Sequence, residues 1–365
     1  MIKALFVYRY CTMGGVETGI RFRIRALPQH EVEAHALFLR DYGGRSAFGD
    51  LDGRVFFGPT ESGFADLVRT QAYDVISVID SFDVLEWIDR MDFAGKVMVE
   101  LRSTYEHTLV HLKRLGDHRL DGILVPSSFQ ADNIRPYLPR KLRDAIPCHV
   151  AHNFVDVETF RRNPQAVAQD DRKIVCWIGR IDPLKNWADF LRVADLLVDR
   201  DDVVFWMVGG GGSKEDERTK FRKALGETRI ATRLRWWPLL PNAKMPSLYS
   251  LVVNSGGLVL LTTKCESFGF AALEAMACGC PLIAPHAGAL PEVIEDGTTG
   301  LLYRSGDVQQ AAHQTGKLLD DDDGRARLAD TAARRTRERF SPNRCAKSFA
   351  HAVRSVAELP AGTAL

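Results

Sequence analysis

The sequence has little of what marks several classes of protein. Its seven cysteines are an odd number without a paired C-x-x-C, which argues against a disulfide framework and a thiolate zinc site. No segment reaches the ~18 apolar residues of a membrane-spanning helix. The formal net charge is +1, so charge gives no argument for a nucleic-acid partner. We therefore expect a cytoplasmic protein with reduced thiols, with peripheral attachment to a membrane left open as an alternative.

Short apolar runs alternate with amphipathic helical stretches along almost the whole chain. Because the first run, MIKALFVYRY, has no cleavage-site pattern, we expect it to form a strand rather than a signal peptide. Two series of strands are expected, at 3–8, 33–38, 74–79, 96–101, 122–125 and 148–151, and then at 174–178, 203–208, 233–236, 258–261 and 281–284.

Alternation of this kind indicates parallel sheets covered by helices, and 365 residues exceed one ordinary domain. We expect an α/β protein with two Rossmann-like doubly wound domains, at residues 1–155 and 156–340, and a C-terminal helix within 341–365. The polar stretch 161–172 is the expected linker.

The most informative segment is KCESFGFAALEAMACGCPLIA, residues 264–284. Gly269 frees the backbone at a turn, and the following residues are mostly good helix formers. Glu266 therefore lies just before a helix, and Glu274 lies inside it. Since a helix N-terminus attracts phosphate, the two carboxylates would stand beside a phosphate site, where they could bind the hydroxyls of a sugar and a ribose. The segment predicts a site for a nucleotide sugar.

Three other segments fall where strands are expected to end, the edge at which open parallel sheets bind ligands. CTMGGVET carries Gly14 and Gly15, WIGRIDPLKN carries Arg180 and Lys185, and MVGGGG carries Gly210. Arg180 and Lys185 would neutralise a diphosphate leaving group, and the glycines would let backbone approach a ligand closely. The plainer alternatives are tight turns and two solvated surface cations.

Glu266 and Glu274 could instead be a glycosidase pair, which needs two carboxyl groups at most ~9.5 Å apart. Eight residues of continuous helix would separate their backbones by about 12 Å, but the loop at the start leaves this distance open. The two cations argue against a simple hydrolase. The acidic run at Asp320–Asp323 is expected to be a solvated turn between helices, not a metal site.

Four motifs occur together in the second half of the chain: HNFVD at 152–156, GRIDPLKN at 179–186, E-x7-E at 266–274 and GALPEVIEDGTTGLL at 288–302. In order and spacing this half resembles the retaining GT-B glycosyltransferases of the glycogen-synthase-like and sucrose-synthase-like group. The first half resembles them through GGVET at 14–18 and VPSS at 125–128. The resemblance implies two Rossmann-like domains that face each other across a cleft, with the C-terminal helix packed back on the first.

By this resemblance Arg180 and Lys185 bind the diphosphate of the donor. Glu266 binds the hydroxyls of the donor sugar, beside the backbone of Phe268, Gly269 and Phe270. Glu274 holds the ribose, and Gly15 contacts the donor from the opposite lobe. The family works without a metal ion and retains the anomeric configuration, by front-face attack with help from the departing phosphate oxygen.

The chain departs from the resembled pattern at two points. Many relatives have a histidine at the end of a first-lobe strand, where it touches the donor sugar. Here Arg102 stands at that point and His107 lies further along, so both are candidates for the role. The usual N-G-V-D is N-F-V-D, with Phe154 in place of glycine, which concerns the turn between the domains more than the chemistry.

We expect a glycosyltransferase that moves a sugar from a nucleotide diphosphate to a hydroxyl acceptor, such as a small molecule, a natural product or a glycan. The expected donor is a UDP-sugar, with a GDP-sugar next, and no separate cofactor is implied. The alternatives are a sugar-nucleotide epimerase or a phosphorylase of the same fold, and a non-catalytic protein that binds sugar nucleotides.

Overall fold

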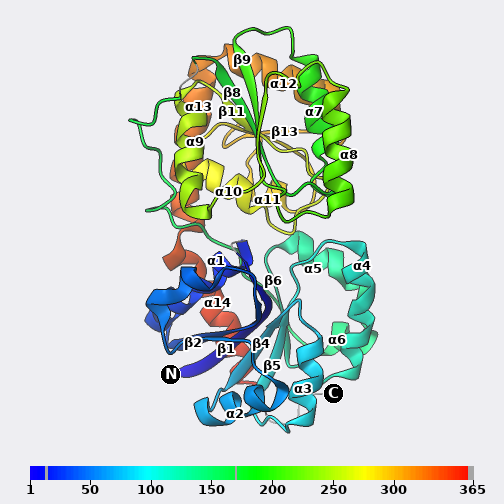
Figure 1. The fold of residues 1–365 in the computed structure, drawn as a ribbon. Helices are drawn as coiled ribbons and strands as arrows, with labels where there is room; N and C mark the ends of the chain where they lie inside the picture. The colour runs from blue at the N-terminus through cyan, green and yellow to red at the C-terminus, as the bar shows by residue number, and fades with distance from the viewer. Residues whose placement is uncertain (13–14, 169–170, 361–365) are drawn as a thin grey trace. The chain divides into compact units, whose positions relative to one another are not determined.

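The computed structural model describes residues 1–12, 15–168 and 171–360, which form two compact units (Figure 1). Unit 1 comprises Met1–Phe154 and Pro342–Leu365, and unit 2 comprises Val155–Ser341. Each unit is built on one parallel sheet with helices on both faces. The expected α/β class with two doubly wound, Rossmann-like domains is therefore confirmed.

The sheet of unit 1 has the strand order β3-β2-β1-β4-β5-β6-β7, and all neighbouring strands are parallel. The chain order reverses between β1 and β4, which is the topological switch point. The strands are β1 (Ile2–Cys11), β2 (Val32–Asp41), β3 (Val55–Phe57), β4 (Val75–Ile79), β5 (Lys96–Glu100), β6 (Gly122–Val125) and β7 (Cys148–Val150).

The helices of unit 1 divide between the two faces of its sheet. The α-helices are α1 (Gly15–Ala26), α2 (Glu61–Gln71), α3 (Asp83–Arg90), α4 (Glu106–Leu109), α5 (Ser128–Ile134), α6 (Arg140–Ala145) and α14 (Pro342–Ala357). The 3-10 helices are η1 (Leu27–His30), η2 (Arg45–Leu51), η3 (Val110–Asp117) and η4 (Arg135–Tyr137). Helix α14 contacts α1, β1, β2, β4 and β5, so this last segment of the chain belongs to the fold of unit 1 (Figure 1).

Unit 2 has the parallel strand order β10-β9-β8-β11-β12-β13, with its switch point between β8 and β11. The strands are β8 (Lys173–Ile178), β9 (Val203–Val208), β10 (Leu234–Trp237), β11 (Leu258–Leu260), β12 (Leu282–Pro285) and β13 (Leu301–Tyr303). The helices are α7 (Trp187–Leu196), α8 (Glu215–Gly226), η5 (Asn242–Lys244), α9 (Met245–Asn254), α10 (Phe270–Ala277), α11 (Leu290–Val293), α12 (Val308–Asp320) and α13 (Asp322–Phe340).

The expected linker at 161–172 does not connect the two units. The chain passes from unit 1 to unit 2 at Phe154 and Val155. The described part of the stretch is bonded to α9 instead: the backbone N–H of Asn163 donates to Ser250 Oγ at 2.9 Å, and Asn254 Nδ2 donates to the carbonyl oxygen of Ala166 at 2.7 Å. Its polar composition reflects an exposed path over unit 2 rather than a domain boundary.

A buried carboxylate network holds the centre of unit 1 together. Glu100, at the end of β5, is 1% exposed and accepts hydrogen bonds from Arg23 Nη1 at 2.7 and 2.9 Å. Ser77 Oγ donates to Glu100 Oε1 at 2.9 Å, and Arg102 Nη2 donates to Oε2 at 2.9 Å. The Arg23 guanidinium also lies 3.9 Å from the ring centroid of Phe349 in α14. The network therefore ties α1, two central strands and α14 to one carboxylate.

We expect Glu100→Ala to lower the free energy of unfolding by about 3–5 kcal/mol, because it leaves two buried guanidinium groups without their counter-charge. Urea unfolding followed by circular dichroism measures the loss. Glu358→Ala is the control, since its exposed side chain should change stability by only about 0.5 kcal/mol. An equal effect of the two substitutions would show that the network contributes nothing to stability.

Candidate functional site

Three segments of unit 2 meet beyond the carboxyl ends of its central strands. Residues 179–186 follow β8, residues 209–212 follow β9, and residues 261–269 lie between β11 and α10. Because β8 and β11 flank the switch point of the sheet, this edge is where an open α/β sheet binds a ligand. The residues expected from the sequence to bind the donor in the second domain lie on these segments or on α10.

The loop of Arg180 and Lys185 is shaped by a carboxylate within it. Asp182 Oδ1 accepts the backbone N–H groups of Leu184 at 3.0 Å and Lys185 at 2.8 Å. Arg180 Nε donates to Asp182 Oδ2 at 3.0 Å, and the Arg180 side chain is 59% exposed. Asp182 was not among the residues predicted for the site, although its place inside GRIDPLKN would have been the signal.

Lys185 and Glu266 form an ion pair, which joins two residues that lie far apart in the sequence. Lys185 Nζ stands 2.5 Å from Glu266 Oε1, and the two side chains are only 23% and 15% exposed. Partial burial strengthens such a pair because less water screens it. A cation suited to phosphate and a carboxylate suited to sugar hydroxyls thus stand in direct contact.

The backbone of Glu266 is fixed from the other side by a glycine turn. Gly288 has φ +58°, and a Cβ there would lie 2.4 Å from the Glu266 carbonyl oxygen. The backbone N–H of Ala289 donates to that oxygen at 2.9 Å. A side chain at residue 288 would displace Glu266, so Gly288 positions the carboxylate. In the sequence, Gly288 was marked only as the first residue of the motif GALPEVIEDGTTGLL.

Helix α10 begins at Phe270, next to this ion pair. Gly269 precedes it with φ +103°, and a Cβ at Gly269 would lie 2.8 Å from Leu290 Cδ2. Phe268 is 1% exposed and packs edge-on against Phe340, with ring centroids 5.8 Å apart. Phe268 therefore anchors the loop in the core, while the first backbone N–H groups of α10 lie at the site edge.

Glu274 lies on the second turn of α10 and is 8% exposed. Tyr249 donates its hydroxyl to Glu274 Oε2 at 3.1 Å. Burial raises the pKa of the Glu274 carboxyl to about 7, while hydrogen bonds from Tyr249 and Asn242 act in the opposite direction. Tyr249 and Asn242 were not predicted from the sequence.

Gly210 connects the glycine-rich turn after β9 to the Arg180 loop. Its φ is +96°, and a Cβ there would lie 2.3 Å from Ile181 Cγ1. A Cβ at Gly209 would likewise lie 2.3 Å from the carbonyl oxygen of Gly179. The backbone N–H of Ile181 donates to Ser213 Oγ at 2.8 Å. Only residues without a side chain allow this approach, so the glycine turn packs directly against the Arg180 loop.

The residues expected in the first domain lie in unit 1. Gly15 is the first residue of α1, whereas Gly14 lies outside the described residues. Glu17, from the same GGVET motif, is 5% exposed and accepts the backbone N–H of Thr12 at 2.7 Å. This carboxylate fixes the entry into α1.

The guanidinium nitrogens of Arg102 donate hydrogen bonds to groups inside the protein. Its side chain is 8% exposed, and Nε and Nη2 both donate to Glu100 Oε2, at 3.1 and 2.9 Å. Nη1 donates to Asn153 Oδ1 at 2.8 Å. These bonds give Arg102 a structural role in the carboxylate network, and they make it the weaker of the two candidates for a ligand contact.

His107 is exposed and lines a cavity of about 310 Å³ between α3 and the helical stretch 106–117. Arg9 and Asp80, at the ends of β1 and β4, also line it, so the cavity lies at the switch point of unit 1. Asp80 has φ +42°, a strained value for this residue type. Burial and the nearby Glu100 raise the pKa of Asp80 to about 7.

In the part of the chain that the structure describes, no three His, Cys, Asp or Glu side chains are grouped so as to hold a metal ion. Among the described helices, none has the length and hydropathy needed to cross a bilayer.

The arrangement can be compared with known proteins. Residues 159–335 match the model of the family described as glycosyl transferases group 1. A D-inositol 3-phosphate glycosyltransferase from Corynebacterium urealyticum is 30% identical over 294 residues, which cover 76% of this chain and 67% of the relative. This chain belongs to the glycosyl transferases group 1 family.

A second relative of the same name, from Mycobacterium sp. (strain JLS), is 32% identical over 221 residues, 57% of this chain and 48% of the relative. The chain thus spans about half the length of several curated relatives that it matches. Anabaena Alr3699/HepE, solved in complex with UDP-glucose, superimposes with a TM-score of 0.81 at 19% identity, over 97% of this chain and 100% of that one.

The sucrose-phosphate synthase from Thermosynechococcus elongatus gives a TM-score of 0.80 at 17% identity, over 98% of this chain and 99% of that one. At these identities the two structures show a shared fold. The fold of the chain is therefore GT-B, as the motifs implied.

The pKa of Glu274 predicts a pH dependence of stability. Because its folded-state pKa is raised from 4.5 to about 7, the carboxyl binds its proton more tightly in the folded state. Its contribution to stability is therefore full below pH 4.5 and is lost as the pH rises to about 7, by about 3 kcal/mol at most.

Glu274→Gln removes this dependence, so the stability difference between variant and wild type should grow in favour of the variant from pH 4.5 to 7.5. Urea unfolding across this range measures it, with Glu227→Gln as the exposed control in unit 2. Parallel pH profiles for wild type and Glu274→Gln would contradict the raised pKa.

Proposed function

We propose that this chain transfers a sugar from a nucleotide-diphosphate donor to a hydroxyl acceptor, with retention of anomeric configuration. The observation that carries the proposal is the Lys185–Glu266 ion pair beside the N-terminus of α10. A leaving diphosphate is stabilised by cations, and the hydroxyl groups of a sugar donate hydrogen bonds to carboxylates. Here a cation, Lys185, and a carboxylate, Glu266, are in direct contact. Family membership and the GT-B fold support the same reaction.

In the proposed reaction Arg180 and Lys185 stabilise the charge that develops on the diphosphate as the bond to the sugar breaks. The exposed Arg180 guanidinium offers a planar fork, and the partly buried Lys185 offers a compact charge. The backbone N–H groups at the start of α10 add their partial positive charge. Such groups lower the barrier because they are oriented before the reaction begins.

Glu266 would accept hydrogen bonds from the donor sugar, and Lys185 and Gly288 hold it for that purpose. Glu274 would accept hydrogen bonds from the ribose hydroxyls on the same helix. The acceptor hydroxyl attacks the face that the diphosphate leaves, and a departing phosphate oxygen takes its proton. Each of these assignments follows the family resemblance residue by residue.

The donor is proposed to be a UDP-sugar, with a GDP-sugar next. One structural neighbour, Anabaena Alr3699/HepE, was solved both with UDP-glucose and with UDP and glucose. For the acceptor, relatives named D-inositol 3-phosphate glycosyltransferase make a phosphorylated polyol the first compound to test. The mixed polar lining of the cavity at Asp80 and His107 suits a polyhydroxylated molecule.

A panel of nucleoside diphosphates tests the donor. We expect UDP to raise the melting temperature most, by roughly 5–10 °C at a hundredfold excess over its Kd, with GDP next. UMP should act more weakly, because it lacks the phosphate that Arg180 and Lys185 bind. A panel of uridine, guanosine, adenosine and thymidine diphosphates without any shift would contradict a nucleotide-sugar site.

Lys185→Ala should lower kcat/KM by a factor of ~10²–10³, since it removes a preorganised charge from the leaving group. Release of nucleoside diphosphate in the presence of donor and acceptor measures the rate. Lys264→Ala is the matched control, because Lys264 is exposed and lies in the same segment as Glu266. Wild-type turnover in Lys185→Ala would contradict the proposed role of the ion pair.

The same assay separates the alternatives. A phosphorylase needs inorganic phosphate rather than a hydroxyl acceptor, and an epimerase consumes its sugar nucleotide without an acceptor. A binding protein shows a thermal shift without transfer to any acceptor. Diphosphate release that depends on the hydroxyl acceptor is expected of the transferase alone.

A further inference from the structure

A cavity of unit 2, of about 570 Å³, lies between α12, α13 and the loop that leads into β13. Gly297 and Thr298 of that loop line it, and they precede the amino end of β13. The candidate donor site lies at the opposite edge of the sheet, beyond the carboxyl ends of β8 and β11. The two sites share no lining residue among those named above.

Three basic side chains surround this cavity. His313 and Lys317 stand four residues apart on α12, which places them on the same face of the helix, and Arg327 comes from α13. In the described part of the chain none of the three makes an ion pair, whereas Arg200 and Arg325 nearby are both paired.

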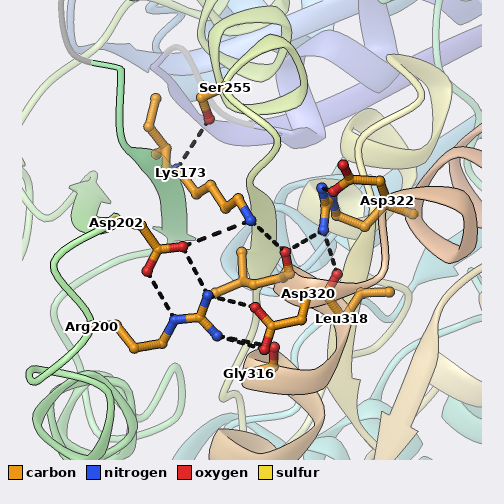
Figure 2. A network of polar contacts seen from close by, with 11 residues as sticks. Lys173, Arg200, Asp202, Ser255, Gly316, Leu318, Asp320 and Asp322 are labelled. Carbon is orange, nitrogen blue, oxygen red and sulfur yellow. Dashed lines mark hydrogen bonds and ion pairs between the residues drawn. The ribbon is translucent and has the colours of Figure 1, made fainter.

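Three of the four acidic side chains in the turn Asp320–Asp323 have partners, as Figure 2 shows in part. Asp320 binds Arg200, with Oδ1 2.7 Å from Nη2, and Asp322 binds Arg325. Asp321 is the one carboxylate in the lining, and its Oδ1 accepts the backbone N–H of Gly324 at 2.7 Å. The expected turn between two helices is present, but these three acidic side chains are engaged rather than simply solvated.

The same contacts hold the wall of the cavity in place. Arg325 Nη1 donates to the carbonyl oxygens of Leu318 and Leu319, both at 2.6 Å, and Lys173 Nζ donates to that of Leu319 at 2.7 Å (Figure 2). They add hydrogen bonds to carbonyl groups at the end of α12, where the Leu318 oxygen also accepts the backbone N–H of Asp321 at 3.3 Å. The turn that brings Lys317 and Arg327 to one cavity is therefore fixed.

The lining is suited to a phosphate group attached to a small organic body. Lys317 and Arg327 supply permanent positive charge, and Thr298 and Thr331 supply hydroxyl donors. Leu301, Leu318 and Leu328 supply an apolar surface. The volume lies in the range of small-molecule sites.

We propose that this cavity binds a phosphomonoester, with Lys317 and Arg327 on the phosphate and the leucines against the organic part. This binding site is independent of the proposed transfer reaction and needs none of its residues. Such a group could reach the cavity on a small soluble molecule or on a lipid headgroup, and the two sources require separate arms of the test.

Hydrogen–deuterium exchange of the full chain tests the proposal with glycerol 3-phosphate as the soluble probe. We expect saturable protection of peptides from residues 308–331, separate from any change at 179–186 and 264–274. Titration calorimetry gives the affinity. Lys317→Gln with Arg327→Gln should weaken binding roughly tenfold or more, because each removes a charged hydrogen bond to phosphate.

Lys223→Gln with Lys347→Gln is the control, since it removes the same charge from exposed lysines outside the cavity. It should leave the protection at 308–331 unchanged. Vesicles containing phosphatidic acid form the second arm, and protection there alone would identify a lipid headgroup as the source. The proposal is overturned if neither probe protects 308–331, or if the Lys317/Arg327 variant and the control bind equally.

Discussion

The strands of each sheet all run in one direction, and the candidate sites depend on this constraint. In a parallel sheet every loop that follows a strand emerges at the same edge, so segments far apart in the sequence become neighbours there. This is how Lys185, after β8, reaches Glu266, after β11, although 81 positions separate them. Unit 1 obeys the same rule, and its Arg9 and Asp80 line one cavity.

The Lys185–Glu266 pair changes how the two glutamates of the E-x7-E segment are understood. They are not equivalent acids, because one is bonded to a cation and the other to a tyrosine hydroxyl. Burial raises the pKa of the Glu274 carboxyl to about 7, whereas the ion pair with Lys185 holds Glu266 in the loop before α10. A glycosidase pair would need both carboxyl groups to face one scissile bond, but Lys185 already occupies one oxygen of Glu266.

The sequence was sufficient for the parts of the fold that follow from local periodicity. The strands that were expected lie within a few residues of those observed, because buried runs such as 174–178 are bounded by clear turn residues. The three-residue strands β3 and β13 were missed, although β7 and β11, which are equally short, were expected. The stretch 161–172 was misjudged because its polarity cannot distinguish a linker from an exposed path over one domain.

The site was predictable to the extent that its residues carry motifs, and unpredictable where tertiary contacts decide. Arg180, Lys185, Glu266 and Glu274 were singled out from their places after expected strands and at a helix start, and the structure brings Lys185 and Glu266 into contact. Asp182 and Gly288 act through the backbone, and Tyr249 contributes a single hydroxyl from another helix, so no local pattern announces them. For Arg102 the sequence indicated only its position after a strand, and the carboxylate to which it is bonded, Glu100, gives it a structural role.

The raised pKa of Glu274 has a consequence for the proposed binding of a nucleotide. Its carboxyl is kept partly protonated near neutral pH by burial, while hydrogen bonds from Tyr249 and Asn242 favour the charged form. Two ribose hydroxyls donating to the same group would add to those bonds and favour ionisation further. Nucleotide binding at this carboxyl would therefore release a proton, and affinity would rise as the pH passes from below to above the pKa of Glu274. In the proposed binding mode, the burial that destabilises the charged carboxylate in the folded protein would thus couple the ribose contact to pH.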